Sequence, residues 1–159
     1  MEWNVRTFWG ELMRLTFTKR SGKHDDLVIE RPGQPSETIS CPKQGIIPHD
    51  MVHYAVESML AHRGFLSLVA EGQAAGFATT GGAAEEAIER LVETFQAEMW
   101  GGRVPAADLL ATYEHACDAR GHAAAPVSVA DVEAIRTRLD ELTAEWTSAP
   151  VNTSLTVEL

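Results

Sequence analysis

The chain has 159 residues, 45% of them hydrophobic, so its length is that of one domain and its apolar content is enough for an ordinary core. Thirteen basic residues against 23 acidic ones give a formal net charge of −10, which repels the phosphates of nucleic acids and an anionic membrane surface. We therefore expect neither nucleic acid nor a membrane as a partner.

The first residues and the cysteines indicate the compartment. Residues 1–6 lack the basic region and the apolar core of a signal peptide, and no apolar run reaches the ~18 residues of a transmembrane helix. We expect a cytoplasmic protein. In a reducing compartment, Cys41 and Cys117 are best interpreted as free thiols.

The N-terminal part of the chain begins with an aromatic-rich segment that has no clear period. We interpret residues 1–12 as an N-terminal extension and residues 13–159 as a single α+β domain. From Met13 to Lys19, apolar residues alternate with polar ones, which is the period of a half-buried strand.

Two further strands follow. A turn over residues 20–23 leads to a strand over 26–30, and we expect His24 and the two aspartates after it to be solvated turn residues. A second turn over residues 32–35 precedes a third strand over 37–41. The simplest product is a three-stranded antiparallel meander with one face covered by helices.

A helix over residues 48–63 joins this meander to the helical part of the chain. Pro48 suits the first position of a helix, Asp50 complements the positive end of its dipole, and Gly64 is a natural stop. Apolar residues recur at i, i+3, i+4, i+7 and i+8 and form one buried stripe. The stripe consists of Val52, Ala55, Val56, Met59 and Leu60.

Three polar residues, His49, His53 and Glu57, follow the edge of that stripe. With Asp50, the two histidines are one conservative change from the His-Glu-x-x-His pattern of zinc hydrolases, in which two imidazoles one turn apart bind one ion. We therefore predict a divalent metal such as zinc on His49 and His53. Asp50, as general base, and Glu57 are the candidate catalytic residues for hydrolysis, and Glu57 can also accept a hydrogen bond from the ring of His53.

Other interpretations of this helix stay open. The third metal ligand has to come from elsewhere, and Glu114, His115 and His122 are the candidates. A histidine beside an apolar stripe is more often a hydrogen-bonded boundary residue than a ligand. Metal-free acid/base chemistry by His53 and Glu57 is a further alternative.

The block Cys-Pro-Lys-Gln-Gly at Cys41, followed by Pro-His-Asp-x-x-His-Tyr-x-Val-Glu from Pro48, resembles that of a family of small bacterial proteins of uncharacterised activity. The resemblance covers about a third of the chain. It implies a bacterial, cytoplasmic protein, and it transfers no functional residue because the family carries no known activity.

The segment after Gly64 is apolar at first and then rich in glycine. We interpret it as a flexible connection and a candidate lid over the histidine edge. Residues 83–100 then show a clear helical period, and Gly101 ends the helix. Its acidic residues are expected to form a solvated face: Glu85, Glu86, Glu89 and Glu93.

Two more helices are predicted before the C-terminal tail. Pro105 opens one that stops at Gly121, and Ser128 with Asp131 forms a capping pair that begins the other. The last helix carries a seam of apolar residues with heptad-like spacing. The seam consists of Val132, Ile135, Leu139, Leu142 and Trp146.

The tail over residues 155–159 alternates again, so it either adds an edge strand to the meander or pairs with a second subunit. The seam and the tail together support an alternative function, a non-catalytic dimerising or partner-binding module. The fold prediction is an α+β protein with an N-terminal meander, about four helices and a C-terminal edge strand.

Overall fold

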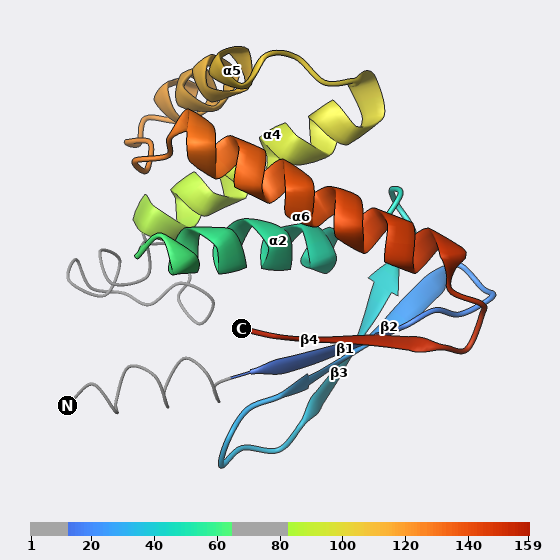
Figure 1. Ribbon diagram of the computed structural model, residues 1–159. Coiled ribbons are helices and arrows are strands. Elements are labelled where there is room, and N and C mark those ends of the chain that lie inside the picture. Colours follow the sequence, from blue (N-terminus) through green and yellow to red (C-terminus); the bar gives the residue numbers. More distant parts are fainter. Residues whose placement is uncertain (1–12, 65–82) are drawn as a thin grey trace. The chain divides into compact units, whose positions relative to one another are not determined.

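The computed structural model describes residues 13–64 and 83–159 (Figure 1). The predicted N-terminal extension and the predicted lid lie outside these residues. The chain divides into two compact units. Of the described residues, 13–50 and 142–159 belong to the sheet unit, and 51–64 and 83–141 belong to the helical unit. That all of this forms a single domain stays a prediction.

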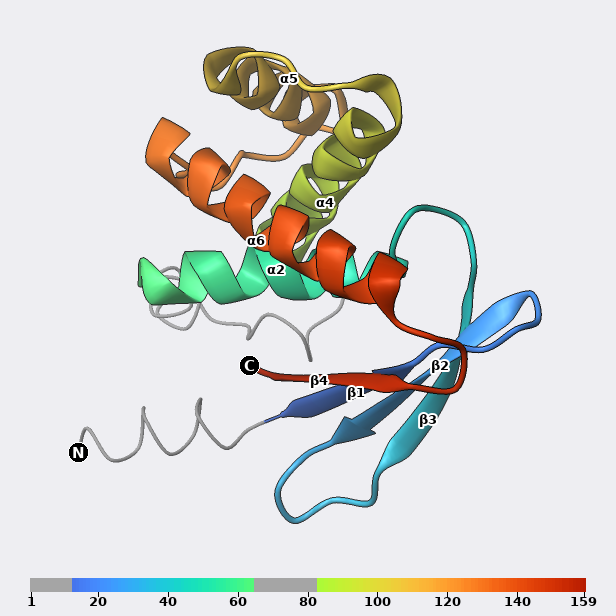
Figure 2. The same cartoon turned by 45° about the vertical axis from the view of Figure 1, so that its right-hand side comes forward.

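The sheet unit contains a four-stranded antiparallel sheet in the order β3-β2-β1-β4. The strands are β1 (Arg14–Thr18), β2 (His24–Glu30), β3 (Glu37–Pro42) and β4 (Ser154–Glu158). Strands β1 and β4 lie side by side in both views (Figure 1 and Figure 2), with Phe17 opposite Leu155. The predicted meander and the predicted edge strand are both confirmed.

The start of β2 corrects one prediction. His24, Asp25 and Asp26 belong to the strand and not to the turn, and Asp25 is only 4% exposed. Its carboxylate accepts a hydrogen bond of 2.8 Å from the backbone N–H of Arg20 and lies 3.4 Å from Nζ of Lys43. Aspartate is rare in strands, so its local preference indicated a turn, whereas these partners satisfy it inside the sheet unit.

The core of the sheet unit forms on one face of the sheet. Leu15, Phe17 and Leu27 are buried there, as the alternation along each strand requires. The ring of Phe17 meets that of Trp146 edge-on, with 6.4 Å between the ring centroids. Such aromatic pairs contribute about 0.5–1.5 kcal/mol beyond the area they bury.

Four helices are described: α2 (His49–His62), α4 (Ala83–Gly101), α5 (Ala106–Ala119) and α6 (Val129–Ser148). Gly64, Gly102 and Gly121 follow α2, α4 and α5 with positive φ, a conformation that glycine adopts without strain. Ser128 and Asp131 cap α6 as predicted, because each side chain accepts a hydrogen bond from the other residue's backbone N–H. Within residues 13–64 and 83–159, no helix is both long and apolar enough to cross a membrane.

Most residues of the predicted apolar faces are buried, although Met59 of the α2 stripe is only partly buried. In the helical unit, α4 buries Leu91, Val92 and Phe95 on the face that its period predicted. Helices α2 and α6 lie side by side in Figure 1 and Figure 2, and the guanidinium of Arg138 lies 5.5 Å from the ring centroid of Tyr54. All five residues of the predicted α6 seam are buried.

The burial of the seam and the pairing of β4 bear on the dimerising alternative. Both features from which that alternative was inferred are used within the chain itself, the seam in its core and the tail in its sheet. Dimerisation itself stays a prediction.

Candidate metal centre

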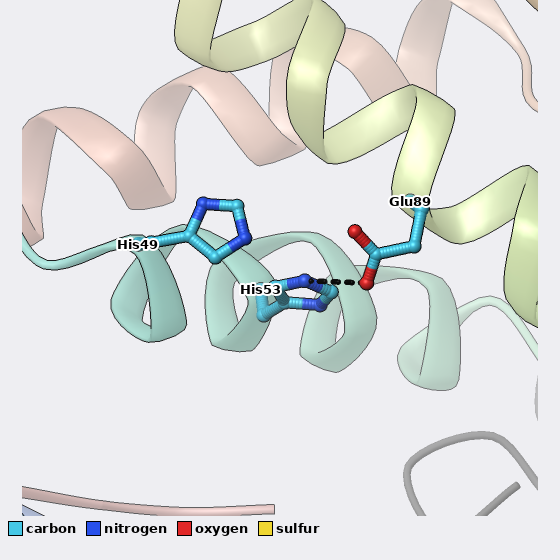
Figure 3. A group of neighbouring side chains, drawn as sticks. All are labelled: His49, His53 and Glu89. Atoms are coloured by element: carbon cyan, nitrogen blue, oxygen red, sulfur yellow. Dashed lines mark ion pairs between the residues drawn. The ribbon is translucent and has the colours of Figure 1, made fainter. Parts of the chain in front are cut away.

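Helices α2 and α4 bring two histidines and one glutamate together. His49 and His53 are one turn apart on α2, and Glu89 reaches toward His53 from α4 (Figure 3). One ligand atom from each residue can be chosen so that all three atoms lie within 4.8 Å of one another. All three residues are half-buried, so the group can be reached from solvent without being fully hydrated.

The imidazole of His53 lies between two carboxylates. Its Nδ1 is 3.1 Å from Oε2 of Glu57, and its Nε2 is 3.0 Å from Oε2 of Glu89. The hydrogen bond to Glu57 is the one predicted from the i, i+4 spacing. It fixes the orientation of the ring, and because Nδ1 and Nε2 lie on different sides of an imidazole, it turns Nε2 toward Glu89.

The protons of this arrangement do not balance by themselves. A neutral imidazole carries one N–H, so it can donate to Glu57 or to Glu89 but not to both. The other ring nitrogen then carries no proton, so its lone pair faces a lone pair of a carboxylate oxygen. One more positive charge is needed, either a proton on the ring or on a carboxylate, or a metal ion between Nε2 and Glu89.

Glu57 is the most deeply buried member of this neighbourhood, with 4% of its surface exposed. Burial raises the pKa of its carboxyl above the ordinary value, because a charge is poorly solvated there. The hydrogen bond and the charge of His53 oppose this rise, whereas Glu89 and Glu85 add to it. A cation near His53 would therefore also favour the ionised form of Glu57.

Asp50, the predicted general base, has a different partner. The thiol of Cys41 donates to its Oδ2 with 3.7 Å between sulfur and oxygen, and Asp50 is not a member of the His49 group. Burial and the adjacent carboxylate raise the pKa of Cys41 to about 12. Cys41 and Cys117 are free thiols, as predicted. The catalytic roles of Asp50 and Glu57 stay predictions.

The third member of the group differs from the three candidates derived from the sequence. Glu114, His115 and His122 are not part of it, and Nδ1 of His122 lies instead 3.1 Å from the carbonyl oxygen of Ala123. Glu89 belongs to the row expected to be solvated, yet its side chain is only 36% exposed. The helical period could assign Glu89 to the polar face of α4, but not the part of that face that meets α2.

The spacing of these atoms suits a tetrahedral zinc ion. Two ligand atoms bound at about 2.0–2.1 Å to one tetrahedral zinc lie about 3.3 Å apart. Nε2 of His53 and Oε2 of Glu89 are 3.0 Å apart, so this pair would have to open by only a few tenths of an ångström. One ligand atom of His49 lies within 4.8 Å of one ligand atom of each of the other two residues, and it would have to move closer to them, which a rotation of its side chain can supply.

Comparison of the chain with protein-family models, with curated proteins and with solved structures found no match in any of the three. The interpretation of the centre therefore depends on its own chemistry.

Proposed function

We propose that the protein binds one divalent metal ion, zinc by the chemistry of its donors, through His49, His53 and Glu89. The observation that supports this most is the position of the His53 ring between two carboxylates, with the imidazole of His49 nearby. Two histidines and one glutamate are a common zinc ligand set, and they leave a fourth position for water or substrate.

Each residue has a distinct role in this proposal. Nε2 of His53 and a carboxylate oxygen of Glu89 bind the ion, and His49 supplies the second nitrogen. Glu57 accepts a hydrogen bond from Nδ1–H of His53, which keeps Nε2 free of a proton and makes it the stronger ligand. The acidic balance of the chain, 23 carboxylates against 13 bases, favours the approach of a cation.

We further propose that the ion activates a water molecule for hydrolysis. A zinc-bound water loses its proton near neutral pH, and this chemistry requires the open fourth position. Asp50 and Glu57 are the candidate bases from the sequence pattern. Glu57 is hydrogen-bonded to His53 and is therefore suited to orient its ring. Asp50 accepts a hydrogen bond from the Cys41 thiol instead, so it is the better candidate for the general base.

Metal affinity tests the proposal directly. Chain purified without an affinity tag and stripped by a chelator is titrated with Zn²⁺ by calorimetry and with Co²⁺, whose visible absorption reports tetrahedral coordination. We expect one site per chain. His53→Ala and Glu89→Gln should each weaken binding by more than about 100-fold, and Glu57→Gln by about 10–100-fold, the usual effect of losing an outer partner of a ligand.

Two control variants use the same helices. His62→Ala removes an exposed histidine at the end of α2, and Glu93→Gln removes an exposed carboxylate one turn beyond Glu89 on α4. Both should bind like the original chain. If Glu89→Gln and Glu93→Gln bind Zn²⁺ equally, or if none of the proteins binds it, the proposed centre is rejected.

The hydrogen bond between His53 and Glu57 also favours a second candidate function, acid/base chemistry without a metal. A carboxylate that orients an imidazole is the basis of many general bases. The titration of His53, followed by NMR in chelator, separates this alternative. A curve left unchanged by Glu57→Gln would exclude it, whatever the result with Zn²⁺.

A further inference from the structure

The sheet unit contains a cavity of about 240 Å³ that is independent of the metal centre. Lys19, Asp25 and Lys43 line it together with the segment that precedes α2 and with Trp146 from the end of α6. Lys43 and Gly45 belong to the Cys-Pro-Lys-Gln-Gly block, to which the metal centre assigns no role. Two residues of this block therefore contribute to a second concave site.

The polar side of the cavity carries a net positive charge. Lys43 lies 3.4 Å from the buried carboxylate of Asp25, so these two charges cancel. Lys19 donates to the carbonyl oxygens of Trp146 and Ala149 at 2.8 and 3.0 Å and has no carboxylate partner among the described residues. In a chain with 23 acidic residues, a half-buried lysine without an anion is an unusual feature.

Both ammonium groups keep a donor for a ligand. An ammonium has three N–H groups, and the two carbonyl oxygens use two of those on Lys19. Lys43 donates to the carbonyl oxygen of Arg20 and faces Asp25, which again accounts for two. Each lysine can therefore donate once more without losing the contacts that hold it in place.

The cavity lining also contains apolar residues. These are Ile46, Ile47 and Pro48 together with Trp146, and Ile46 is 45% exposed although it is a large aliphatic residue. Lys19 also lies over the ring of Trp146, with 5.7 Å from Nζ to the ring centroid. A cationic end beside an apolar wall fits a ligand that has an anionic head and a short hydrophobic body.

We propose that this cavity binds a small organic oxyanion, a carboxylate or a phosphate monoester, with its head on Lys19 and Lys43 and its body on Ile46 and Trp146. The volume is just below the range of about 300–1,000 Å³ typical of ligand pockets, so the ligand is small. Carboxylates and phosphates both carry negatively charged oxygens that two ammonium groups can bind. A separate probe for each anion distinguishes the two.

The test uses NMR titrations of the full chain with three probes of similar size. Benzoate and phenyl phosphate represent the two anions, and benzamide is the neutral counterpart of benzoate. We expect saturable shifts of the Gly45 amide and of the Trp146 indole with at least one anion, with a Kd on the order of 1 mM for a probe of about ten non-hydrogen atoms. Benzamide should bind at least about tenfold more weakly.

Two matched variants place a negative charge inside and outside the cavity. Ile46→Glu adds a carboxylate to its wall and should weaken anion binding by about tenfold or more. Ile39→Glu makes the same change on β3 at a similarly exposed isoleucine that does not line the cavity, and it should leave binding unchanged. Both positions are exposed enough for the variants to fold.

Lys43→Gln gives an independent reading, with Lys23→Gln as its exposed control. Loss of anion binding in Ile46→Glu but not in Ile39→Glu supports the proposal even if Lys43→Gln is too unstable to titrate. The proposal is overturned if neither anion binds, if benzamide binds as well as the anion that binds more tightly, or if the two glutamate variants bind alike. None of these results depends on Zn²⁺.

Discussion

Two charge clusters in the helical unit differ in how their charges are compensated. In the first, the guanidinium of Arg136 donates through Nε and Nη2 to both carboxylate oxygens of Glu98, and Nη2 also donates to the carbonyl oxygen of Val104. Both side chains are 7% exposed. In the second, the His53 imidazole faces Glu57 and Glu89, and one ring that is neutral or singly charged meets two acids.

The difference separates a structural ion pair from a candidate binding site. Arg136 and Glu98 balance each other in charge and in hydrogen bonds, and the hydrogen bonds to Glu98 raise the pKa of Arg136, which keeps it charged. The His53 cluster balances only when a proton or a metal ion is added. A cluster that needs an additional charge to complete it is therefore the better candidate for function.

The largest effect is expected from breaking the balanced pair. Arg136→Met should lower the free energy of unfolding by about 3–5 kcal/mol, because it leaves Glu98 buried with only the partly exposed Arg103 nearby. Urea unfolding of the metal-free chain measures this loss. The double change Arg136→Met and Glu98→Leu should recover most of it, and a double variant as unstable as the single one would contradict the assignment.

The next effect concerns the unbalanced cluster. Zn²⁺ at a free concentration of 100 times its Kd should raise the free energy of unfolding by about 2.7 kcal/mol, since the ion binds the folded chain and not the unfolded one. Thermal unfolding with and without Zn²⁺ measures the gain. Glu89→Gln should abolish it, whereas Arg136→Met should keep it, because the balanced pair plays no part in metal binding.

A smaller effect follows from the pKa of Glu57. The folded state raises this pKa above its ordinary value of 4.5, so the folded chain holds the proton more tightly than the unfolded chain does. The contribution to stability is complete below pH 4.5 and is lost as the pH rises through the folded pKa. Urea unfolding in chelator between pH 4 and 8 should therefore show a decline that Glu57→Gln makes shallower. Parallel curves would contradict the burial of a titrating acid.

The smallest effect is expected where an ion pair is exposed to solvent. Glu93 lies 3.0 Å from the buried guanidinium of Arg90, but its own side chain is 50% exposed. Glu93→Gln should change the free energy of unfolding by less than about 1 kcal/mol, because water and salt screen such a pair. A loss as large as that expected for Arg136→Met would show that solvent exposure of the partner does not determine how much an ion pair stabilises the fold.

The order and type of the elements followed from local patterns in the sequence. Alternation predicted β1 and the tail, a period of 3.6 predicted the helices, and Ser128 with Asp131 marked the start of α6. These signals are local because each depends on residues within a turn or a strand. For that reason, the α+β fold, the meander and the C-terminal edge strand were predictable.

The metal centre was predictable only in part. His49, His53 and Glu57 lie on one helix, so their spacing in the sequence determined which side chains share an edge of that helix and which pair can form a hydrogen bond. Glu89 comes from another helix, and local periodicity could place it only on a polar face. For the same reason, no local pattern indicated that Asp25 would be buried beside Lys43.

The sequence by itself determined where the chain forms helices and strands, because backbone propensity and hydrophobic period act over a few residues. Only the tertiary structure decided which charges meet. Contacts such as His53 with Glu89 and Lys43 with Asp25 join residues far apart in the chain, and their energy depends on distance and burial, which exist only after the elements have packed.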